Sequence, residues 1–477
     1  MLALAACLMA DPATAGNKGE DSRILNTLEQ AAEFYSGLSL KGAYVWEYSA
    51  DLRVRKGEGK VGPTTAWVQP PGTPAVGAAF LRLYEITDKP AWLGAARYAA
   101  EALIETQLIS GGWYNAIELD PEAQDRWCYR ARGITAETCD RIEDNRARNR
   151  TLLDDDNTQS ALRLLIWLDR IFEGKDGAVR DAALYALKRL SEAQYPVGAW
   201  PVMFDKAPKM DEIKPAPAAS LPADWSRTWV KPAGGPYYIL NDNLMRDMVH
   251  LFLVAEQHFA EPKYLERAKR AGEFLLKAQL PEPQQGWAQT YNETMQPVWG
   301  RKFEPPSVAS RETAGAITCL IELYGRTGDK RFLDAAKKAG AWLEKVRLPD
   351  GDWARFYELA TNRPIYVGND EKLTYEPVDL LSHYGMKIRK GIPEALALLA
   401  QAEKGENPPK PLWPSIADTM PEAEVKQRTA TLLATIDSEG RWLEDGEGQE
   451  DAWIRSATFI DAVFVMAKEL ENKRQRR

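Results

Sequence analysis

A helical repeat is the feature of this sequence that most limits how the chain can fold. Four similar segments follow one another, each preceded by another apolar helical segment and followed by a short turn and a tryptophan. The segments are residues 91–107, 178–194, 263–279 and 331–347, and the tryptophans are Trp113, Trp200, Trp287 and Trp353. A helix hairpin that repeats in this way buries its apolar face only by stacking on its neighbours. The sequence therefore predicts an array of stacked helix hairpins.

The apolar positions within each segment have helical spacing. In the fourth copy they fall on one helix face, formed by Phe332, Ala335, Ala339, Trp342, Leu343 and Val346. No comparable run alternates with a period of two, so we expect little β-structure. We predict an all-α fold, an (α/α) toroid whose loops form a cleft at one end of an inner and an outer helix ring. An open α-solenoid is the alternative, but the long and irregular tryptophan-bearing loops favour the closed ring.

The N-terminus has the pattern of a secretory signal. A short apolar run ends in Ala13-Thr14-Ala15, a small-x-small cleavage pattern before Gly16. A lipoprotein anchor at Cys7 and a start without an export signal are the alternatives. We expect a secreted or periplasmic protein. We also expect no membrane span, because no later apolar stretch is long enough to cross a membrane.

We divide the chain into a signal peptide at 1–16, a toroid domain at 17–403 and a C-terminal part at 404–477. Within the toroid, residues 204–236 are rich in proline and polar side chains, which indicates an inserted loop. The C-terminal part starts with a proline-rich connection and continues as a helical segment that we expect to pack on the toroid.

Charge and composition narrow the classes of partner. The formal net charge is -8, which excludes a generally basic nucleic-acid-binding surface. A polyanionic substrate would therefore need a local basic cleft or a bridging cation. The three histidines make a histidine-based metal site a poor candidate. We expect a monomer.

The cysteines fit an exported protein. Cys128 and Cys139 flank a polar loop, so export would allow a disulfide between them, with two free thiols as the alternative. Cys319 lies in an apolar helical run and is predicted to be a core residue.

Two acidic clusters come directly before predicted inner helices. The first is Asp154-Asp155-Asp156-Asn157, and the second is Asp242 between two asparagines, one repeat later. Adjacent carboxylates repel one another, and oxygen ligands at this density suit Ca²⁺. If successive inner helices lie side by side, Asp154 and Asp242 face one cleft. Helix capping by these side chains is the alternative.

Arginine and aromatic side chains follow the third and fourth repeats. Arg301, Lys302 and Glu304 lie before a proline pair, and Arg311 directly precedes the next inner helix. Behind Trp353 follow Arg355, Tyr357, Glu358, Asn362, Arg363 and Tyr366. A guanidinium group binds a carboxylate through two hydrogen bonds, and aromatic rings, among them Trp200 and Trp353, offer faces to sugars. Each arginine has a structural salt bridge as its alternative role.

Several of these segments resemble the pectate lyases of polysaccharide lyase family 10. They are AQYPVGAWPVMF (193–204), DDDNTQSAL (154–162), WGRKFEPPS (299–307) and WARFYELATNRPIY (353–366), together with the Asn-Asp pair before an inner helix. The similarity covers roughly residues 150 to 370 in order. It implies an (α/α) toroid lyase that acts on polygalacturonate with calcium.

The resemblance also implies roles for individual residues. Counting back from Thr158 in the family's Asp-Asn-Gly-Ala-Thr motif places a calcium ligand at Asp154, and a second acidic position resembles Asp242. The catalytic arginine resembles Arg301, and the arginine that binds the substrate carboxylate resembles Arg363. The chain departs from the family in the motif's middle residues, Asp155-Asp156-Asn157. It also departs at Arg311, where family members tend to have a small residue, and in the 204–236 insert.

The chemistry that these residues suit is β-elimination. The C5 proton of a uronic acid lies next to a carboxylate, and positive charge on that carboxylate makes the proton easier to remove. Free arginine is nearly always protonated, so Arg301 can act as the base only where its charge is disfavoured, and Lys302 is the alternative base. A toroid hydrolase with paired carboxylates and a non-catalytic binder of acidic polysaccharides are competing functions. Alginate and glucuronan remain possible substrates.

Overall fold

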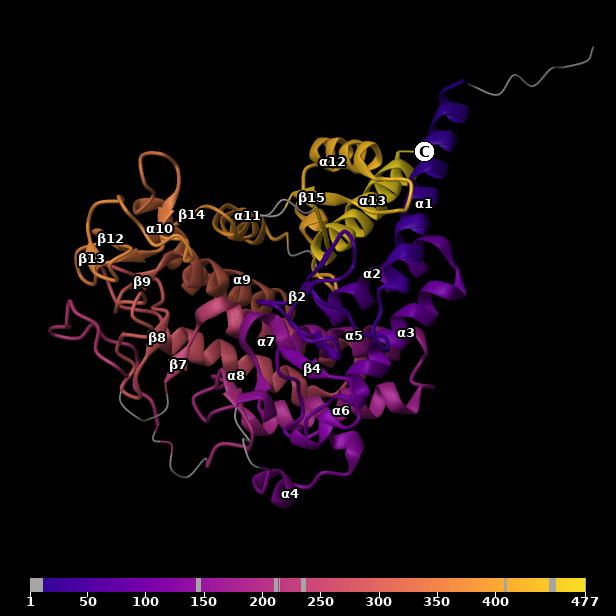
Figure 1. The fold of residues 1–477 in the computed structure, drawn as a ribbon. Coiled ribbons are helices and arrows are strands. Elements are labelled where there is room, and N and C mark those ends of the chain that lie inside the picture. Colours follow the sequence, from indigo (N-terminus) through magenta and orange to yellow (C-terminus); the bar gives the residue numbers. More distant parts are fainter. Residues whose placement is uncertain are drawn as a thin grey trace, which may run out of the picture. The chain divides into compact units, whose positions relative to one another are not determined.

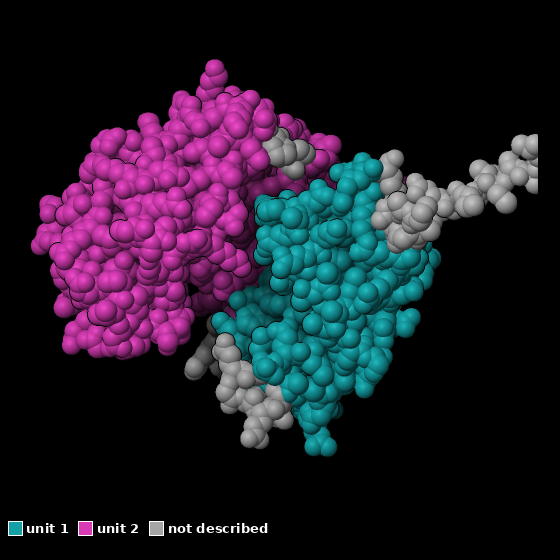
Figure 2. All heavy atoms as spheres, turned by 90° about the horizontal axis from the view of Figure 1, so that it is seen from above, with its two compact units in different colours: residues 1–106, 116–124, 413–477 teal, residues 107–115, 125–412 magenta. Residues whose placement is uncertain are grey.

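The computed structural model divides the chain into two compact units. It describes residues 12–142, 147–209, 213, 215–232, 237–406, 410–445 and 452–476. Unit 1 consists of residues 1–106, 116–124 and 413–477, and unit 2 of residues 107–115 and 125–412 (Figure 2). Cys7 and most of the expected signal lie outside the described residues.

Unit 1 joins the two ends of the chain. Its helices are α1 (Pro12–Gly37), α2 (Thr73–Thr87), α3 (Pro90–Glu105), α12 (Glu422–Thr435) and α13 (Ser456–Gln475). One sheet has the order β15 (Leu443–Asp445), β16 (Ala452–Arg455), β1 (Glu47–Ser49) and β2 (Arg55–Lys56), and β3 (Thr65–Trp67) pairs with β4 (Ala116–Glu118). The antiparallel register of β1 and β16 places Glu47 opposite Arg455, and the two side chains form an ion pair at 3.1 Å.

Unit 2 is built from three helix hairpins (Figure 1). They are α5 (Asn157–Ile171) with α6 (Gly177–Ala193), α7 (Leu244–Phe259) with α8 (Pro262–Ala278), and α9 (Ser310–Thr327) with α10 (Lys330–Lys345). The shorter α4 (Ala136–Asp140) and α11 (Ile392–Glu403) complete the helices longer than one turn that are described in this unit. The four predicted repeat segments are thus helices α3, α6, α8 and α10.

Burial separates inner from outer helices in unit 2. Every residue of α5 from Asn157 to Asp169 is buried, whereas α6 buries one face. Helix α7 packs on both α5 and α9, so the first helices of the hairpins form one layer. This is the inner and outer arrangement that the sequence predicts.

Strands in unit 2 are short, as the lack of period-two patterning predicts. β5 (Thr151–Leu152) pairs with β6 (Met203–Phe204), β7 (Tyr238–Ile239) with β8 (Thr290–Tyr291), and β10 (Trp353–Ala354) with β14 (Lys387–Ile388). A four-stranded sheet has the order β13 (Leu373–Thr374), β12 (Pro364–Val367), β11 (Phe356–Tyr357) and β9 (Val308–Ala309). These strands hold together the loops that lead into the inner helices.

A glutamine at the end of each of three repeat segments sets the spacing between neighbours. Gln107, Gln194 and Gln279 each donate one hydrogen bond to the following loop and one to a backbone carbonyl of the next outer helix. The acceptors on the next helices are Ala182, Arg267 and Ala335, at 2.9, 3.0 and 2.9 Å. Each of these side-chain amides thus holds the loop that follows it against the next outer helix.

The repeated tryptophans close the hairpins. The indole N–H groups of Trp200, Trp287 and Trp353 donate to carbonyls of the preceding outer helices, at 2.8, 2.9 and 2.8 Å, and all three rings are buried. In unit 1, Trp442 makes the same bond to Leu432 at 3.0 Å, which extends the motif beyond the four copies found in the sequence. A large buried ring with its one polar atom satisfied is a stabilising core element.

The described residues of the 204–236 insert form no helix or strand beyond Phe204. Residues 210–212, 214 and 233–236 lie outside the described part. Elsewhere in unit 2, Cys128 and Cys139 form the expected disulfide beside the buried Leu108 and Tyr129. Cys319 is buried in α9, as predicted. None of the helices described in either unit is long and apolar enough to cross a membrane.

Candidate functional site

Two matching turns precede the inner helices α5 and α7. The single-turn helices η4 (Asp154–Asp156) and η6 (Asn241–Asn243) each contain two successive residues with positive φ. These are Asp155 (48°) and Asp156 (58°) in the first turn, and Asp242 (49°) and Asn243 (61°) in the second. Short polar side chains tolerate this left-handed conformation better than most residues. The alignment makes Asp155, not Asp154, the counterpart of Asp242.

The two turns bring three carboxylates together. Asp154, Asp155 and Asp242 offer one oxygen atom each, and these atoms lie within 4.8 Å of one another. Burial raises the pKa of Asp154 to about 7, and the charges of Asp242 and Asp155 act in the same direction. The positive charge of Arg301 opposes the shift, which places that arginine within electrostatic reach. Such a group of oxygen ligands can hold a metal ion.

Arg311 adds a cation to this carboxylate cluster. It lies in the first turn of α9, the next inner helix, and its Nη1 is 3.4 Å from Oδ1 of Asp242. About a third of the Arg311 side chain is exposed. Three successive inner helices therefore contribute charged groups from their N-terminal ends to one place.

Arg301 belongs to a hydrogen-bond network behind the carboxylates. Its Nε and Nη2 donate to Oε1 of Glu304, at 2.8 and 2.5 Å, and its backbone N–H donates to Oε2 at 2.8 Å. Burial lowers the pKa of Arg301, but the hydrogen bonds and charge of Glu304 outweigh it and raise the pKa above its usual range. In this arrangement Arg301 is held in its charged form.

Gln289 and Tyr384 connect this network to the second turn. Gln289 donates from Nε2 to Oε1 of Glu304 and to Oδ1 of Asn241, both at 2.7 Å. The Tyr384 hydroxyl donates to the same Glu304 oxygen at 3.0 Å. Burial raises the pKa of the Tyr384 hydroxyl above its ordinary value, so the hydroxyl stays protonated and can donate this hydrogen bond. Asn241, beside Asp242, is thus linked through Gln289 to Glu304 and Arg301.

Arg355 and Glu312 form a buried pair on the other side of Tyr384. Their closest charged atoms are 3.8 Å apart, and the Arg355 guanidinium lies 3.9 Å from the centre of the Tyr384 ring. Burial raises the pKa of Glu312, although Arg355 and Arg311 both oppose it. Neither carboxylate oxygen of Glu312 has a hydrogen-bond partner within the described residues. Arg355 therefore acts on the site through the ring of Tyr384 and the charge of Glu312.

Asp156 points away from the carboxylate cluster. Arg163 of α5 donates two hydrogen bonds to its carboxylate, Nη1 to Oδ1 at 2.8 Å and Nη2 to Oδ2 at 2.5 Å. The Arg163 side chain is 5% exposed and that of Asp156 is 26% exposed, so Asp156 balances the charge of a buried guanidinium. Of the four aspartates that the sequence offers as metal ligands, the structure groups three and engages the fourth elsewhere.

Four of the expected substrate-binding residues have structural contacts. Trp200 and Trp353 are buried and close their hairpins. The buried Tyr357 hydroxyl donates to the Val346 carbonyl at 2.7 Å, and Oδ1 of Asn362 accepts the indole N–H of Trp342 at 2.8 Å. The rings of Trp200, Trp353 and Tyr357 are thus buried, whereas Asn362 is half-buried and engages its Oδ1 in structural hydrogen bonds.

Lys302 and Arg363 are exposed on loops. Lys302 pairs with Glu371 at 2.8 Å. The Arg363 guanidinium stacks 3.6 Å above the ring of Tyr375, whose hydroxyl donates to Oε1 of Glu358 at 2.7 Å. Both residues remain accessible to a ligand, unlike the tryptophans.

The sequence pattern does not mark Gln289, Glu312 or Tyr384 as candidate site residues. Gln289 could be found from the repeat, because it follows Trp287 by two residues. Arg355, which the sequence does mark, follows Trp353 by the same distance. No local pattern marks Tyr384, whose partners are distant in sequence. The position two residues after a repeat tryptophan is therefore the sequence signal that could have identified Gln289 as a site residue.

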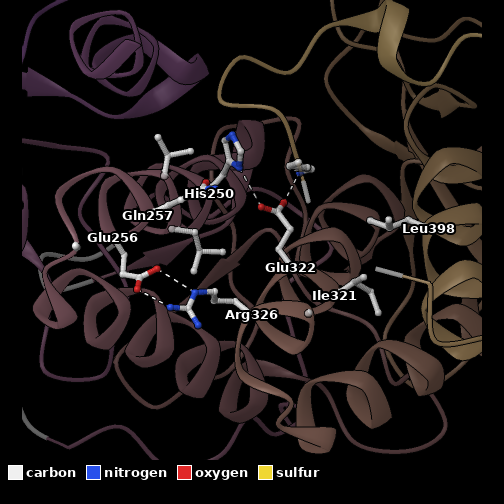
Figure 3. A pocket seen from close by; sticks show the side chains of 12 residues that line it. His250, Glu256, Gln257, Ile321, Glu322, Arg326 and Leu398 are labelled. Carbon is white, nitrogen blue, oxygen red and sulfur yellow. Dashed lines mark hydrogen bonds and ion pairs between the residues drawn. The ribbon is translucent and has the colours of Figure 1, made fainter. Parts of the chain in front are cut away.

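A separate cavity of about 450 Å³ lies at the other end of the same helices (Figure 3). Glu256, Gln257 and Ala260 line it at the end of α7, and Gly325 and Arg326 at the end of α9. Since Leu244 starts α7 and Gln257 lies 13 residues on, the helix rise puts about 20 Å between them. The cavity is thus distinct from the carboxylate cluster.

The charged groups of this cavity are already paired. Glu256 pairs with Arg326 at 2.5 Å, and Glu322 pairs with His250 at 3.0 Å and with Lys410 (Figure 3). Burial would raise the pKa of Glu322, but Lys410 and His250 outweigh it and lower the pKa to about 2. These contacts tie α7, α9 and the segment after α11 together.

Comparisons with known proteins identify the fold. No protein-family model matches the chain, and the search of curated proteins finds no match. Among solved structures, a D-mannose isomerase has a TM-score of 0.50 at 14% identity, over 94% of this chain and 98% of the isomerase. An unsaturated glucuronyl hydrolase specific for heparin has a TM-score of 0.46 at 11% identity, over 95% and 98%. A mutant of a family 10 polysaccharide lyase from Cellvibrio cellulosa has a TM-score of 0.46 at 17% identity, over 69% and 97%.

Similarity at these identities establishes the fold alone. The chain has the (α/α)-toroid fold, as its sequence predicts, and shares its architecture with the D-mannose isomerase. The fold leaves the reaction open, because one architecture supports many chemistries. The function must therefore be argued from the site.

Proposed function

We propose that this protein is a calcium-dependent lyase that cleaves polygalacturonate, an acidic polysaccharide, by β-elimination. The resemblance of its site segments to family 10 polysaccharide lyases motivates the proposal. The observation that carries it is the meeting of Asp154, Asp155 and Asp242 with Arg311 and Arg301 at one end of the inner helices. An acidic sugar bound there could contact a bound cation and two guanidinium groups directly.

The donor set fits calcium. Ca²⁺ prefers oxygen ligands in a flexible arrangement, and three carboxylates within 4.8 Å provide such ligands. The pKa of Asp154 is raised to about 7 by burial and by the two neighbouring carboxylates, so a divalent cation there would relieve unfavourable charge. A bound calcium ion would supply positive charge next to the sugar carboxylate and so make the neighbouring C–H bond more acidic.

The chain's own residues would bind and orient the substrate. Arg363 and Arg311 are exposed enough to accept sugar carboxylates, each through the paired N–H groups of a guanidinium. Gln289 and Tyr384 hold Glu304 in place, which fixes the position of Arg301. This preorganisation keeps the charged groups in position before the substrate arrives.

Arg301 is the proposed base. It would take the C5 proton of the uronic acid while the C5–H electron pair forms the C4–C5 double bond, the C4–O bond breaks, and water protonates the leaving oxygen. A guanidinium group can take a proton only after it has lost one, and Glu304 opposes that loss here. Alkaline pH and substrate-induced release of Arg301 from Glu304 would favour it, and Lys302 is the alternative base.

One observation favours a second candidate, a hydrolase on the same toroid. A carboxylic acid with a pKa of about 7, such as Asp154, is suited to act as a general acid at neutral pH. Asp155 or Asp242 would then be the second carboxylate. An exported enzyme fits either function, and the Cys128–Cys139 disulfide is compatible with export.

A single assay separates these functions. The purified protein is incubated with polygalacturonate, alginate or glucuronan, each with calcium or with a chelator, and the ultraviolet absorbance of an unsaturated product is followed. A lyase gives absorbance that depends on calcium and on the uronate supplied. New reducing ends without that absorbance would reject the lyase in favour of the hydrolase.

A further inference from the structure

An aromatic segment of the insert, residues 225–229, is hydrogen-bonded to the loop that contains Arg301. Trp299, next to that loop, donates its indole N–H to the Ser226 carbonyl at 2.9 Å. In return, Trp229 of the insert donates its indole N–H to the Gly300 carbonyl at 3.1 Å. These reciprocal bonds place residues 225–229 directly beside Arg301.

An arginine of the insert lies on an aromatic ring within this segment. The Arg227 guanidinium stacks 3.8 Å above the ring of Trp225, and its Nη2 lies 3.4 Å from Oε1 of Glu358. Half of the Arg227 side chain is exposed. Stacking holds the guanidinium flat while its edge stays accessible to a ligand.

A second pair of the same kind approaches the same carboxylate oxygen. The hydroxyl of Tyr375 donates to Oε1 of Glu358 at 2.7 Å, and Arg363 stacks on the Tyr375 ring at 3.6 Å. Two segments far apart in sequence therefore meet at Glu358, one through the Arg227 guanidinium and the other through the hydroxyl of the ring on which Arg363 stacks. The repetition of guanidinium on ring around one carboxylate is unlike an ordinary surface salt bridge.

Exposed rings complete this surface. Trp229 and Tyr375 are 39% and 36% exposed, among the few large hydrophobic side chains on the described surface of unit 2. Leaving such rings in water forgoes the free energy of burying them, which a ligand that covers them would recover. A sugar ring offers an apolar face that fits on them, and a uronic acid adds a carboxylate for the arginines.

We propose that Trp225, Arg227 and Trp229 of the insert form an additional subsite for a uronic-acid unit, next to the Arg301 loop. This inference rests on the proposed function and extends it, since the insert would add a binding position for a longer acidic chain. The Arg227 guanidinium, which contacts Asp224 and Glu358, and the exposed Arg363 would bind the carboxylate of a uronate, which a neutral sugar lacks. A purely structural role, in which the segment only anchors the insert, would change stability but leave affinity intact.

Calorimetric titration with oligogalacturonates from monomer to hexamer tests the subsite. The full-length protein is titrated in calcium as wild type, as Trp229→Ala and as Arg227→Gln. Arg331→Gln is the matched control, because Arg331 is a similarly exposed arginine paired with carboxylates on the outer helices. We expect each insert variant to bind the hexamer about tenfold more weakly than wild type, with a smaller loss for shorter ligands. The control should bind all of them as wild type does.

The outcomes separate this inference from the proposed function. If wild type cleaves the hexamer and both insert variants bind it as tightly as wild type, the subsite is rejected and the lyase stands. If wild type neither binds nor cleaves any oligouronate, the proposed function fails and the subsite fails with it. If a neutral hexasaccharide binds with the same dependence on Trp229 and Arg227, the assignment to uronates is overturned.

Discussion

Arg311 forms an ion pair with Asp242, a member of the carboxylate cluster, with 3.4 Å between Nη1 and Oδ1. A metal ion bound by Asp242 would have to compete with this guanidinium. Opposite unit charges about 4 Å apart attract by about 4 kcal/mol at a protein surface, and partial exposure of Arg311 reduces that figure. Arg311 therefore acts as a resident cation in the metal-free protein.

We expect Arg311→Ala to bind divalent cations more tightly than wild type, by about tenfold. Terbium luminescence or calorimetry with calcium measures this affinity without any substrate. Arg331→Gln, which removes a distant surface arginine, should leave the affinity unchanged. Weaker metal binding in Arg311→Ala would instead mean that this arginine supports the site.

The pKa of Asp154 predicts how stability changes with pH in the absence of metal. Its pKa is raised from 3.8 to about 7 by burial and by Asp242 and Asp155. Between these values the folded state keeps a proton that the unfolded state has released. The free energy of unfolding therefore falls as pH rises from about 4 to about 7 and stays low above that.

The variant Asp154→Asn removes this titration. In a chelator at about pH 8, we expect it to be about 2 kcal/mol more stable than wild type, with a much smaller difference at about pH 5. Thermal melts at both pH values measure the effect. Calcium should stabilise wild type at the higher pH more than the variant. An equal pH dependence of the two proteins would refute the buried, repelled carboxylate.

The helices could be predicted because their apolar periodicity is local. The fourth repeat was expected at 331–347, and α10 spans Lys330–Lys345. The pairing of β1 with β16 could not be predicted in this way, because Glu47 and Arg455 are hundreds of residues apart. Repetition shows that a hairpin exists, whereas contacts between chain ends depend on the assembled fold.

The residue types of the site could be predicted from the sequence better than the directions in which their side chains point. Two aspartates adjacent in sequence, Asp155 and Asp156, both have positive φ, yet one joins the cluster and the other pairs with Arg163. Backbone turns of this kind leave no pattern in the sequence that tells the two apart. The repeat tryptophans suggest faces for sugar binding in the sequence, whereas in the structure their regular spacing reflects a shared hydrogen bond to the preceding helix.

The pair of Arg301 and Glu304 predicts two separate kinetic effects. If Arg301 is the base, Arg301→Ala should lower kcat about a hundredfold or more while oligogalacturonate still binds in the presence of calcium. Glu304→Gln removes the charge that raises the pKa of Arg301, so its activity should rise at lower pH than that of wild type. Rate profiles against pH for both variants check this. Full turnover by Arg301→Ala would assign the base elsewhere, with Lys302→Ala as the next variant.

The buried tryptophans should matter for stability. Trp353 is 1% exposed and donates to the Leu343 carbonyl, so Trp353→Ala should lower the free energy of unfolding by about 3–5 kcal/mol. Trp353→Phe keeps most of the ring and should cost about 1 kcal/mol through the lost hydrogen bond. Urea unfolding of both variants, with Leu184→Ala at an exposed position of α6 as control, measures these differences. A stable Trp353→Ala protein with weakened sugar binding would restore the ring to the binding site.

Asp155 and Asp156 provide a matched pair that tests which aspartates serve the metal. Asparagine tolerates positive φ, so Asp155→Asn and Asp156→Asn leave the turn intact and each remove one charge. Asp156→Asn deprives the buried Arg163 of its carboxylate and should cost about 2 kcal/mol of stability with little change in metal affinity. Asp155→Asn should weaken metal binding about tenfold and leave stability near that of wild type. The double variant Asp156→Asn with Arg163→Met, which also removes the buried guanidinium and keeps a residue that tolerates positive φ, should recover stability. The reverse result, a metal defect confined to Asp156→Asn, would show that this aspartate leaves Arg163 to become a ligand when the ion binds.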